Sequence, residues 1–105
     1  MPTLNTQNSF DNACFAIAHE IANVVIAKQH DYGHDNILAF REQGLVVRLW
    51  DKINRLKNLF WSGKEPKNES LDDTFTDIAG YAIIGLMLAN GTFTNELKED
   101  SYGKG

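Results

Sequence analysis

The stretch that decides the fold runs from residue 70 to residue 90 and reads SLDDTFTDIAGYAIIGLMLAN. Ser70 is a residue type that caps the start of a helix, and two aspartates follow in the first turn, where negative charge suits the helix dipole. Gly91 comes directly after the stretch and is typical of a helix end. From Ile78 onward the segment is apolar almost all round, so the sequence predicts a long helix that needs cover on more than one side.

Two further segments have apolar residues at helical spacing. The first is predicted over residues 9–29, with Ser9 as its N-cap and Gly33 closing it. The second is predicted over residues 44–61, and a short helix is expected over 35–42. Residues 62–68 read as a loop because they combine Gly and Pro without periodicity.

No segment alternates with a period of two, so the predicted fold class is all-α. We expect a small helical bundle of three main helices plus short helices, joined by short connections. The bundle forms a single domain over residues 9–91, and residues 92–105 are predicted to be a polar C-terminal tail.

The size of the chain bears on how it is stabilised. Its 105 residues, 43% of them hydrophobic and 23% charged, suit one ordinary globular domain. A monomer this small buries only about 60% of its unfolded surface, and the single cysteine, Cys14, rules out an intramolecular disulfide. Because the 70–90 helix also requires cover that two partner helices hardly supply, we predict a homo-oligomer, most simply a homodimer.

Charge is distributed unevenly along the chain. The net charge of −4 argues against non-specific binding to nucleic acids, which requires a basic surface. Residues 41–67 nevertheless carry seven bases against three acids, whereas residues 1–40 and 68–100 are both acidic overall. A basic middle therefore lies between two acidic flanks, which is compatible with solvated faces but also with a site for an anion.

The sequence predicts a cytoplasmic protein that does not enter a membrane. Residues 1–8 lack the basic start and the apolar run of a signal peptide. The longest apolar stretch, residues 78–89, is shorter than the roughly 18 to 20 residues that a membrane-spanning helix needs.

Acidic and basic side chains recur at helical spacing on two of the predicted helices. Asp73 and Asp77 lie four residues apart on the 70–90 helix, with Tyr81 one turn later along the same edge. Carboxylates beside bases suit phosphate chemistry with Mg²⁺, which takes one or two carboxylates together with substrate phosphates and waters. The candidate metal ligands are Asp51, Asp73, Asp77 and Glu20, and the candidate phosphate contacts are Arg48, Lys52 and Arg55. Tyr81 is a further candidate contact of the nucleotide.

These residues also have plain structural interpretations. Asp51 can pair with Arg55 one turn away, and Asp73 can serve only as an N-terminal helix charge. The three histidines, His19, His30 and His34, do not form an H-E-x-x-H motif, so zinc is not expected. Cys14 and Trp50 lie on apolar stripes and are expected in the core, which leaves Trp61, at a helix end, as the better candidate for stacking on a base.

Three blocks of the sequence carry a resemblance to a known family. They read KQHDYG at 28–33, VRLWDKINRLKNL at 47–59 and ESLDDTFTDIAGYA at 69–82. Together they resemble the nucleotide modification associated domain 1 family of small proteins common in phages and prophages. That family is similar in turn to the MazG-like all-α nucleoside triphosphate pyrophosphohydrolases, which bind Mg²⁺ and release pyrophosphate. The resemblance implies that Asp31 or Tyr32 borders a nucleotide pocket.

The acidic residues depart from the MazG-like pattern of Glu-x-x-Glu on one helix and Glu-x-x-Asp on the next. Here Asp73 and Asp77 are four residues apart, the first helix offers only Glu20, and the second offers Asp51. Three hypotheses therefore stand. The first is a Mg²⁺-dependent nucleoside triphosphate pyrophosphohydrolase that acts on (deoxy)nucleotides. The others are a protein that binds a nucleotide without cleaving it, and a protein-interaction module.

Overall fold

The computed structural model describes residues 9–61 and 70–97, which form four helices and no strand. The helices are α1 (Phe10–Tyr32), α2 (Asp35–Leu38), α3 (Arg41–Trp61) and α4 (Leu71–Asn90). The all-α prediction is therefore confirmed. The predicted loop over 62–68, and the part of the predicted tail after residue 97, lie outside the described residues.

The predicted helix caps are present. The Ser9 hydroxyl accepts a hydrogen bond from the backbone N–H of Asn12 at 3.1 Å, and the Ser70 hydroxyl accepts one from the N–H of Asp73 at 3.0 Å. Gly33 and Gly91 end α1 and α4 with φ values of +74° and +81°, a region that glycine adopts without strain. The structure differs from the sequence prediction mainly in length, since α1 extends to residue 32 and α3 already begins at residue 41.

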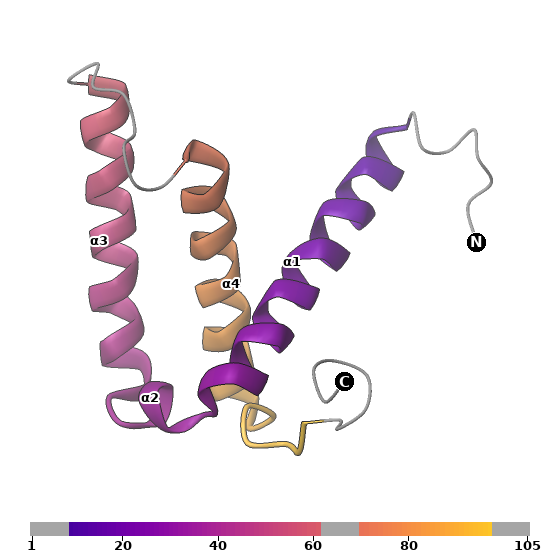
Figure 1. Cartoon of the computed structure of the whole chain (residues 1–105), viewed down its shortest axis with the longest axis vertical. Coiled ribbons are helices and arrows are strands. Elements are labelled where there is room, and N and C mark those ends of the chain that lie inside the picture. Colours follow the sequence, from indigo (N-terminus) through magenta and orange to yellow (C-terminus); the bar gives the residue numbers. More distant parts are fainter. Residues whose placement is uncertain (1–8, 62–69, 98–105) are drawn as a thin grey trace.

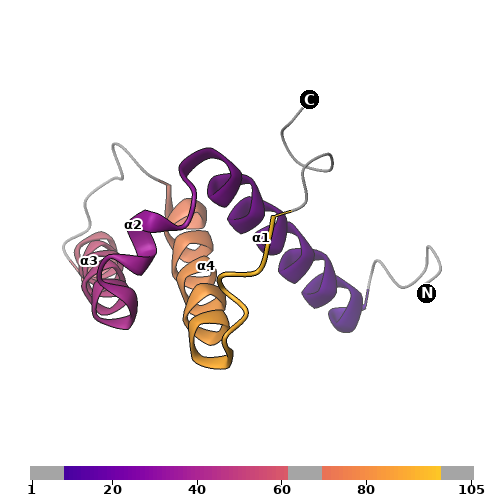
Figure 2. The same cartoon turned by 90° about the horizontal axis from the view of Figure 1, so that it is seen from below.

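The central helix of the fold is α4. It packs against α3 on one side and against α1 on the other, while α2 packs against α3. Figure 1 shows that α3 and α4 run side by side in opposite directions, and Figure 2 shows α4 between α3 and α1. The C-terminal half of α1 crosses α4, whereas its N-terminal half diverges from the other helices and projects outward (Figure 1).

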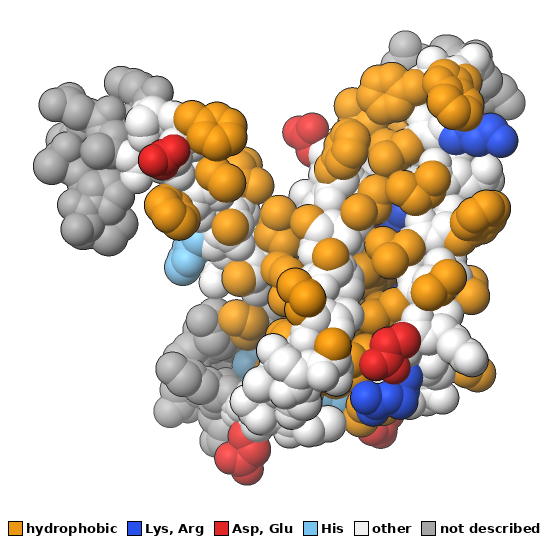
Figure 3. All heavy atoms as spheres, turned by 180° about the vertical axis from the view of Figure 1, so that it is seen from behind, with side chains coloured by type: hydrophobic (Ala, Val, Ile, Leu, Met, Phe, Trp, Pro, Cys, Tyr) orange, Lys and Arg blue, Asp and Glu red, His pale blue; other side chains and the backbone are white. Residues whose placement is uncertain are grey.

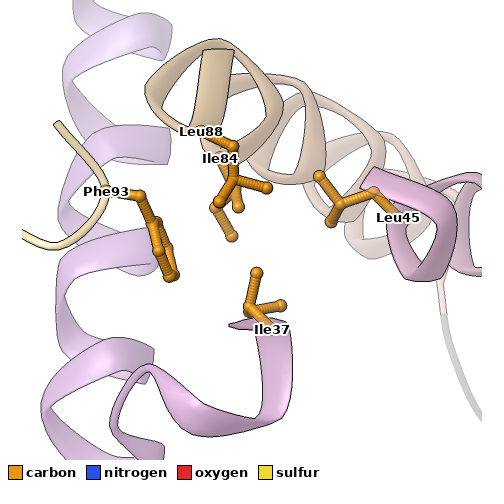
Figure 4. Close-up of a cluster of buried hydrophobic side chains, with 5 residues drawn as sticks. All are labelled: Ile37, Leu45, Ile84, Leu88 and Phe93. Carbon is orange, nitrogen blue, oxygen red and sulfur yellow. The ribbon is translucent and has the colours of Figure 1, made fainter. Parts of the chain in front are cut away.

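The hydrophobic core lies at the end of the bundle that α2 closes. Figure 4 shows its five buried side chains pointing toward one another from α2, α3, α4 and the segment after α4. They are Ile37, Leu45, Ile84, Leu88 and Phe93. Phe93, which is only 3% exposed, belongs to the stretch predicted to be a polar tail. The chain thus folds back after α4 and contributes to the core beyond residue 91.

Many of the apolar side chains that the sequence places on helix stripes are exposed in the structure. Cys14 and Trp50 were expected in the core, but Cys14 is exposed and Trp50 is 75% exposed. The prediction of burial is wrong for both residues within this chain, because no other part of residues 9–61 and 70–97 covers their faces of α1 and α3. Figure 3 shows hydrophobic side chains gathered over the projecting half of α1 and across α3 and α4.

Helix α1 has the length and the apolar composition of a membrane-spanning helix. Its 23 residues are long and apolar enough to cross a bilayer. The same length and composition occur in core helices of soluble proteins and in signal sequences. The location of the protein therefore stays a prediction.

Candidate functional site: a cationic cavity between α1 and α4

A cavity of about 350 Å³ lies where α1 crosses α4. Helices α1 and α4 supply most of its wall, α2 supplies Asn36 and Ile37, and α3 supplies Arg48. Ile37 and Ile84 belong both to this wall and to the hydrophobic core, so the cavity stands directly on the best-packed part of the molecule. Its volume falls within the range of roughly 300 to 1,000 Å³ that is usual for sites of small molecules.

One carboxylate in the wall joins three helices. Asp77 on α4 forms an ion pair with a lysine on each of its two neighbouring helices. Its Oδ1 lies 3.3 Å from Nζ of Lys28 on α1, and its Oδ2 lies 2.8 Å from Nζ of Lys52 on α3. The side chains of Asp77 and Lys52 are 18% and 12% exposed, so this pair is largely removed from water. An ion pair in such surroundings is screened much less by salt than one at the surface.

The surroundings of Asp77 act on its pKa in opposite directions. Burial raises the pKa, because it penalises the charged carboxylate. The hydrogen bond from Lys52, the positive charge of Lys28 and the hydrogen bond from Lys28 lower it, and together they outweigh burial. The net pKa of Asp77 lies below its ordinary value, so the carboxylate is ionised at neutral pH.

Positive charge exceeds negative charge around the cavity. Lys28, Arg48 and Asp77 line it, and Lys52 reaches it through Asp77. At and beside the cavity, three cationic groups therefore outnumber one carboxylate, and an anion such as a phosphate would meet a favourable field there.

Polar side chains and one glycine shape the remaining wall. The buried Gln29 side chain lines the cavity, and its Oε1 lies 3.1 Å from Nδ1 of His34, which also packs against the ring of Phe93. At Gly80, an added Cβ would lie 3.1 Å from Cγ2 of Val25, closer than most such contacts. The absence of a side chain there therefore lets α1 approach α4 at the cavity.

The structure brings together part of the predicted site. Arg48, Asp77, Tyr32 and Tyr81 line the cavity, and Lys52 contacts Asp77. The other predicted residues do not line the cavity: they are Glu20, Asp31, Asp51, Arg55, Trp61 and Asp73. Among these, Arg55 is half-buried and the rest are exposed. Asp73 lies in the first turn of α4, as its structural interpretation required.

The predicted magnesium site stays a prediction. Within residues 9–61 and 70–97, no three acidic, histidine or cysteine side chains form a group that could hold a metal ion. Asp77 is the predicted carboxylate that lines the cavity, and both of its oxygens are paired with lysines. Mg²⁺ often binds through only one or two carboxylates together with phosphates and waters, so these observations do not test an ion that arrives with a polyphosphate.

The sequence reasoning missed Lys28, Gln29 and Asn36, three of the polar residues in the wall. A signal for Lys28 was present, because it follows Val24 and Val25 along the apolar stripe of its helix. A base on such a stripe predicts a paired acid on the facing helix. No comparable pattern marks Asn36, which the short helix α2 brings to the cavity.

Comparison with known proteins gives one result. The family model described as nucleotide modification associated domain 1 matches residues 28–88. This match begins at Lys28 and spans α2, α3 and most of α4, including all the charged residues of the cavity. No curated protein and no solved structure matches the chain.

Proposed function

Because the chain belongs to the nucleotide modification associated domain 1 family, we propose that it binds a nucleotide in the cavity between α1 and α4. One observation carries the proposal: Lys28 and Arg48 line a cavity of about 350 Å³ together with a single carboxylate, Asp77, which pairs with Lys28 and Lys52. A nucleotide combines anionic phosphate with a flat base, so its site requires positive charge beside apolar and aromatic surface.

Each part of the wall has a role in this proposal. Arg48 binds the phosphate through its planar guanidinium, and Lys28 exchanges part of its contact with Asp77 for a phosphate oxygen. Tyr32, which is 69% exposed where it borders the cavity, stacks on the base. The side-chain amides of Gln29 and Asn36 can donate and accept hydrogen bonds and so distinguish one base edge from another.

Calorimetry with the full chain tests the proposal. Titration with nucleoside mono-, di- and triphosphates should give saturable binding, and Arg48→Gln should weaken it about tenfold or more. Arg41→Gln is the control, because Arg41 is also a base of α3 but is exposed, pairs with Glu42 and does not line the cavity. Equal losses for both variants, or no binding by the unmodified chain, would refute the site.

A second candidate function is Mg²⁺-dependent hydrolysis of a nucleoside triphosphate to the monophosphate and pyrophosphate. It is favoured by the position of Asp77 on the cavity wall. A magnesium ion would supply charge neutralisation and an activated water. In this function Asp77 would be the protein ligand of the ion, while Arg48 and Lys52 would orient the phosphates.

The two functions differ in what is recovered after binding. The purified protein is incubated with each triphosphate and Mg²⁺, and pyrophosphate is assayed. Pyrophosphate release that is lost in Asp77→Ala supports the hydrolase, whereas saturable binding with intact ligand recovered supports a protein that only captures the nucleotide. Because Asp77→Ala also removes an ion-pair partner, its helical content is checked by circular dichroism.

A further inference from the structure

The N-terminal arm, residues 10–20 of α1, continues an apolar stripe that, among the residues the structure describes, is covered only in the second half of α1. The stripe recurs at steps of three and four residues through Phe10, Cys14, Ile17, Ile21 and Val24. Near Val24 the stripe packs against α4 and lines the cavity. Along the arm it is bare, with Phe10 83% and Ile17 56% exposed.

A second bare stripe runs along α3. Its members are spaced by four, three and seven residues and therefore share one helix face. This α3 stripe consists of Val46, Trp50, Ile53 and Phe60, each more than half exposed. Toward the end of α3 its surface is hollowed by a groove of about 300 Å³, lined by Ile53, Leu56, Lys57, Phe60 and Trp61.

The exposed aromatic area is larger than a soluble monomer ordinarily shows. Seven Phe and Trp side chains of the described residues are 51% to 83% exposed, namely Phe10, Phe15, Phe40, Trp50, Phe60, Trp61 and Phe75. At roughly 150 to 250 Å² for a whole aromatic side chain, the four on the arm, the α3 stripe and its groove expose on the order of 600 Å² together, namely Phe10, Trp50, Phe60 and Trp61. One partner of a stable protein complex contributes about 800 Å² to the interface. The exposed aliphatic members of the two stripes, Ile17, Val46 and Ile53, add to the aromatic area, so the two surfaces together approach the area that such an interface needs. Figure 3 shows hydrophobic side chains over the arm and over α3 and α4.

The arm and the α3 stripe belong to helices of opposite charge. Helix α1 contains three acidic residues and one lysine, whereas α3 contains five basic and two acidic residues. Helix α4 lies between the two helices, so the arm cannot reach the α3 stripe of its own chain (Figure 2). Electrostatic complementarity therefore favours contact between the arm of one copy and the α3 stripe of another.

We propose that two copies of the chain associate about a twofold axis, with the arm of each lying on the α3 stripe of the other. A second copy fits these surfaces because each copy supplies both an arm and an α3 stripe. The two surfaces are apolar, and the helices that carry them have opposite net charge. The chain also has a reason to associate with itself, since residues 9–61 and 70–97 form a core of only five buried hydrophobic residues. The dimer would hold α1 in place, and with it the half of α1 that lines the cavity.

Light scattering after size exclusion tests the dimer. The full chain should have twice the monomer mass of 11.8 kDa at tens of micromolar. Ile17→Asp on the arm and Trp50→Asp on the α3 stripe should each raise the dimer dissociation constant about a hundredfold or more. Both side chains are largely exposed in the single chain, so helical content should persist. Phe40→Asp is the control, because Phe40 is 72% exposed but lies off both surfaces.

Mixing the two variants tests the arrangement itself. A heterodimer of Ile17→Asp with Trp50→Asp places both defects in one contact and leaves the other arm-on-stripe contact intact. The mixture should therefore recover dimers that neither variant forms alone. Failure to recover them would overturn the reciprocal arrangement, as would a dimer that withstands both substitutions. If the unmodified chain stays monomeric at 100 µM, the proposal that a second copy covers these surfaces is wrong. The same conclusion holds if the monomeric chain binds lipid vesicles or a foreign protein instead.

Discussion

The two halves of α1 have the same apolar stripe and opposite surroundings. The second half crosses α4, lines the cavity and places Lys28 against Asp77. The first half, with Phe10 and Ile17, contacts no other helix closely enough to be buried. An amphipathic pattern therefore shows which face of a helix favours burial, but it does not show whether the same chain supplies the cover.

The largest expected effect belongs to the core beneath the packed half of α1. Ile84→Ala should lower the free energy of unfolding by about 3 kcal/mol, since it removes a buried side chain and leaves a cavity. Ile17→Ala on the bare half should cost below about 0.5 kcal/mol at protein concentrations where the chain is monomeric. Urea unfolding of both variants measures the difference, and comparable losses would contradict the division of α1 into a packed and a bare half.

Removal of the charge on Asp77 should have the next largest effect. Asp77→Asn should cost about 2 kcal/mol, because it breaks two ion pairs, one with the largely buried Lys52. The pKa of Asp77 is lowered in the folded chain, so the unfolded chain binds this proton more readily. The stabilisation is therefore complete above about pH 4, near the ordinary pKa of Asp, and is lost as the pH falls through the folded pKa.

Unfolding measured between pH 2 and pH 7 checks this assignment. The difference in stability between the unmodified chain and Asp77→Asn should narrow as the solution becomes more acidic. A difference that is independent of pH would mean that the substitution acts through packing rather than through charge.

A smaller effect should appear where α1 approaches α4 most closely. Gly80→Ala should push Val25 and α1 outward and weaken nucleotide binding about tenfold, while thermal stability changes by less than about 1 kcal/mol. Gly85→Ala on the same helix is the matched control, because its added Cβ would make an ordinary contact of 3.6 Å with Leu45. Calorimetry should therefore separate two substitutions that are chemically identical.

The helix caps should give the smallest effect. Ser70→Ala removes the N-cap of the central helix and should cost about 1 kcal/mol in global unfolding. Ser9→Ala removes the equivalent hydrogen bond from the bare arm, where it should only increase local fraying at dilute protein concentration. Amide hydrogen exchange distinguishes the two: loss of protection should stay within the arm for Ser9→Ala and extend through the bundle for Ser70→Ala.

Features that depend on neighbouring residues could be predicted from the sequence, whereas features that depend on contacts between distant segments could not. Helix ends depend on local chemistry, so Ser9, Gly33, Ser70 and Gly91 could be assigned from the sequence. The pairing of Lys28 with Asp77 depends on how α1 crosses α4. The spacing of residues along one helix does not determine this crossing. The burial of Phe93 likewise depends on a return of the chain after α4.

The candidate site was predicted in part for the same reason. Asp77 and Arg48 were identified because each lies on a polar edge of its own helix. Asp51 and Glu20 lie on comparable edges, but the helix crossing does not turn those edges toward the cavity. Periodicity identifies the faces of single helices, and only their relative rotation decides which acids meet.

The double pairing of Asp77 has a consequence for proton exchange with solvent. A phosphate that draws Lys28 and Lys52 toward itself deprives the carboxylate of the charges that keep it ionised. Its proton affinity then rises, so nucleotide capture in acidic buffer should be accompanied by proton uptake, and the heat of binding there should vary with the ionisation enthalpy of the buffer.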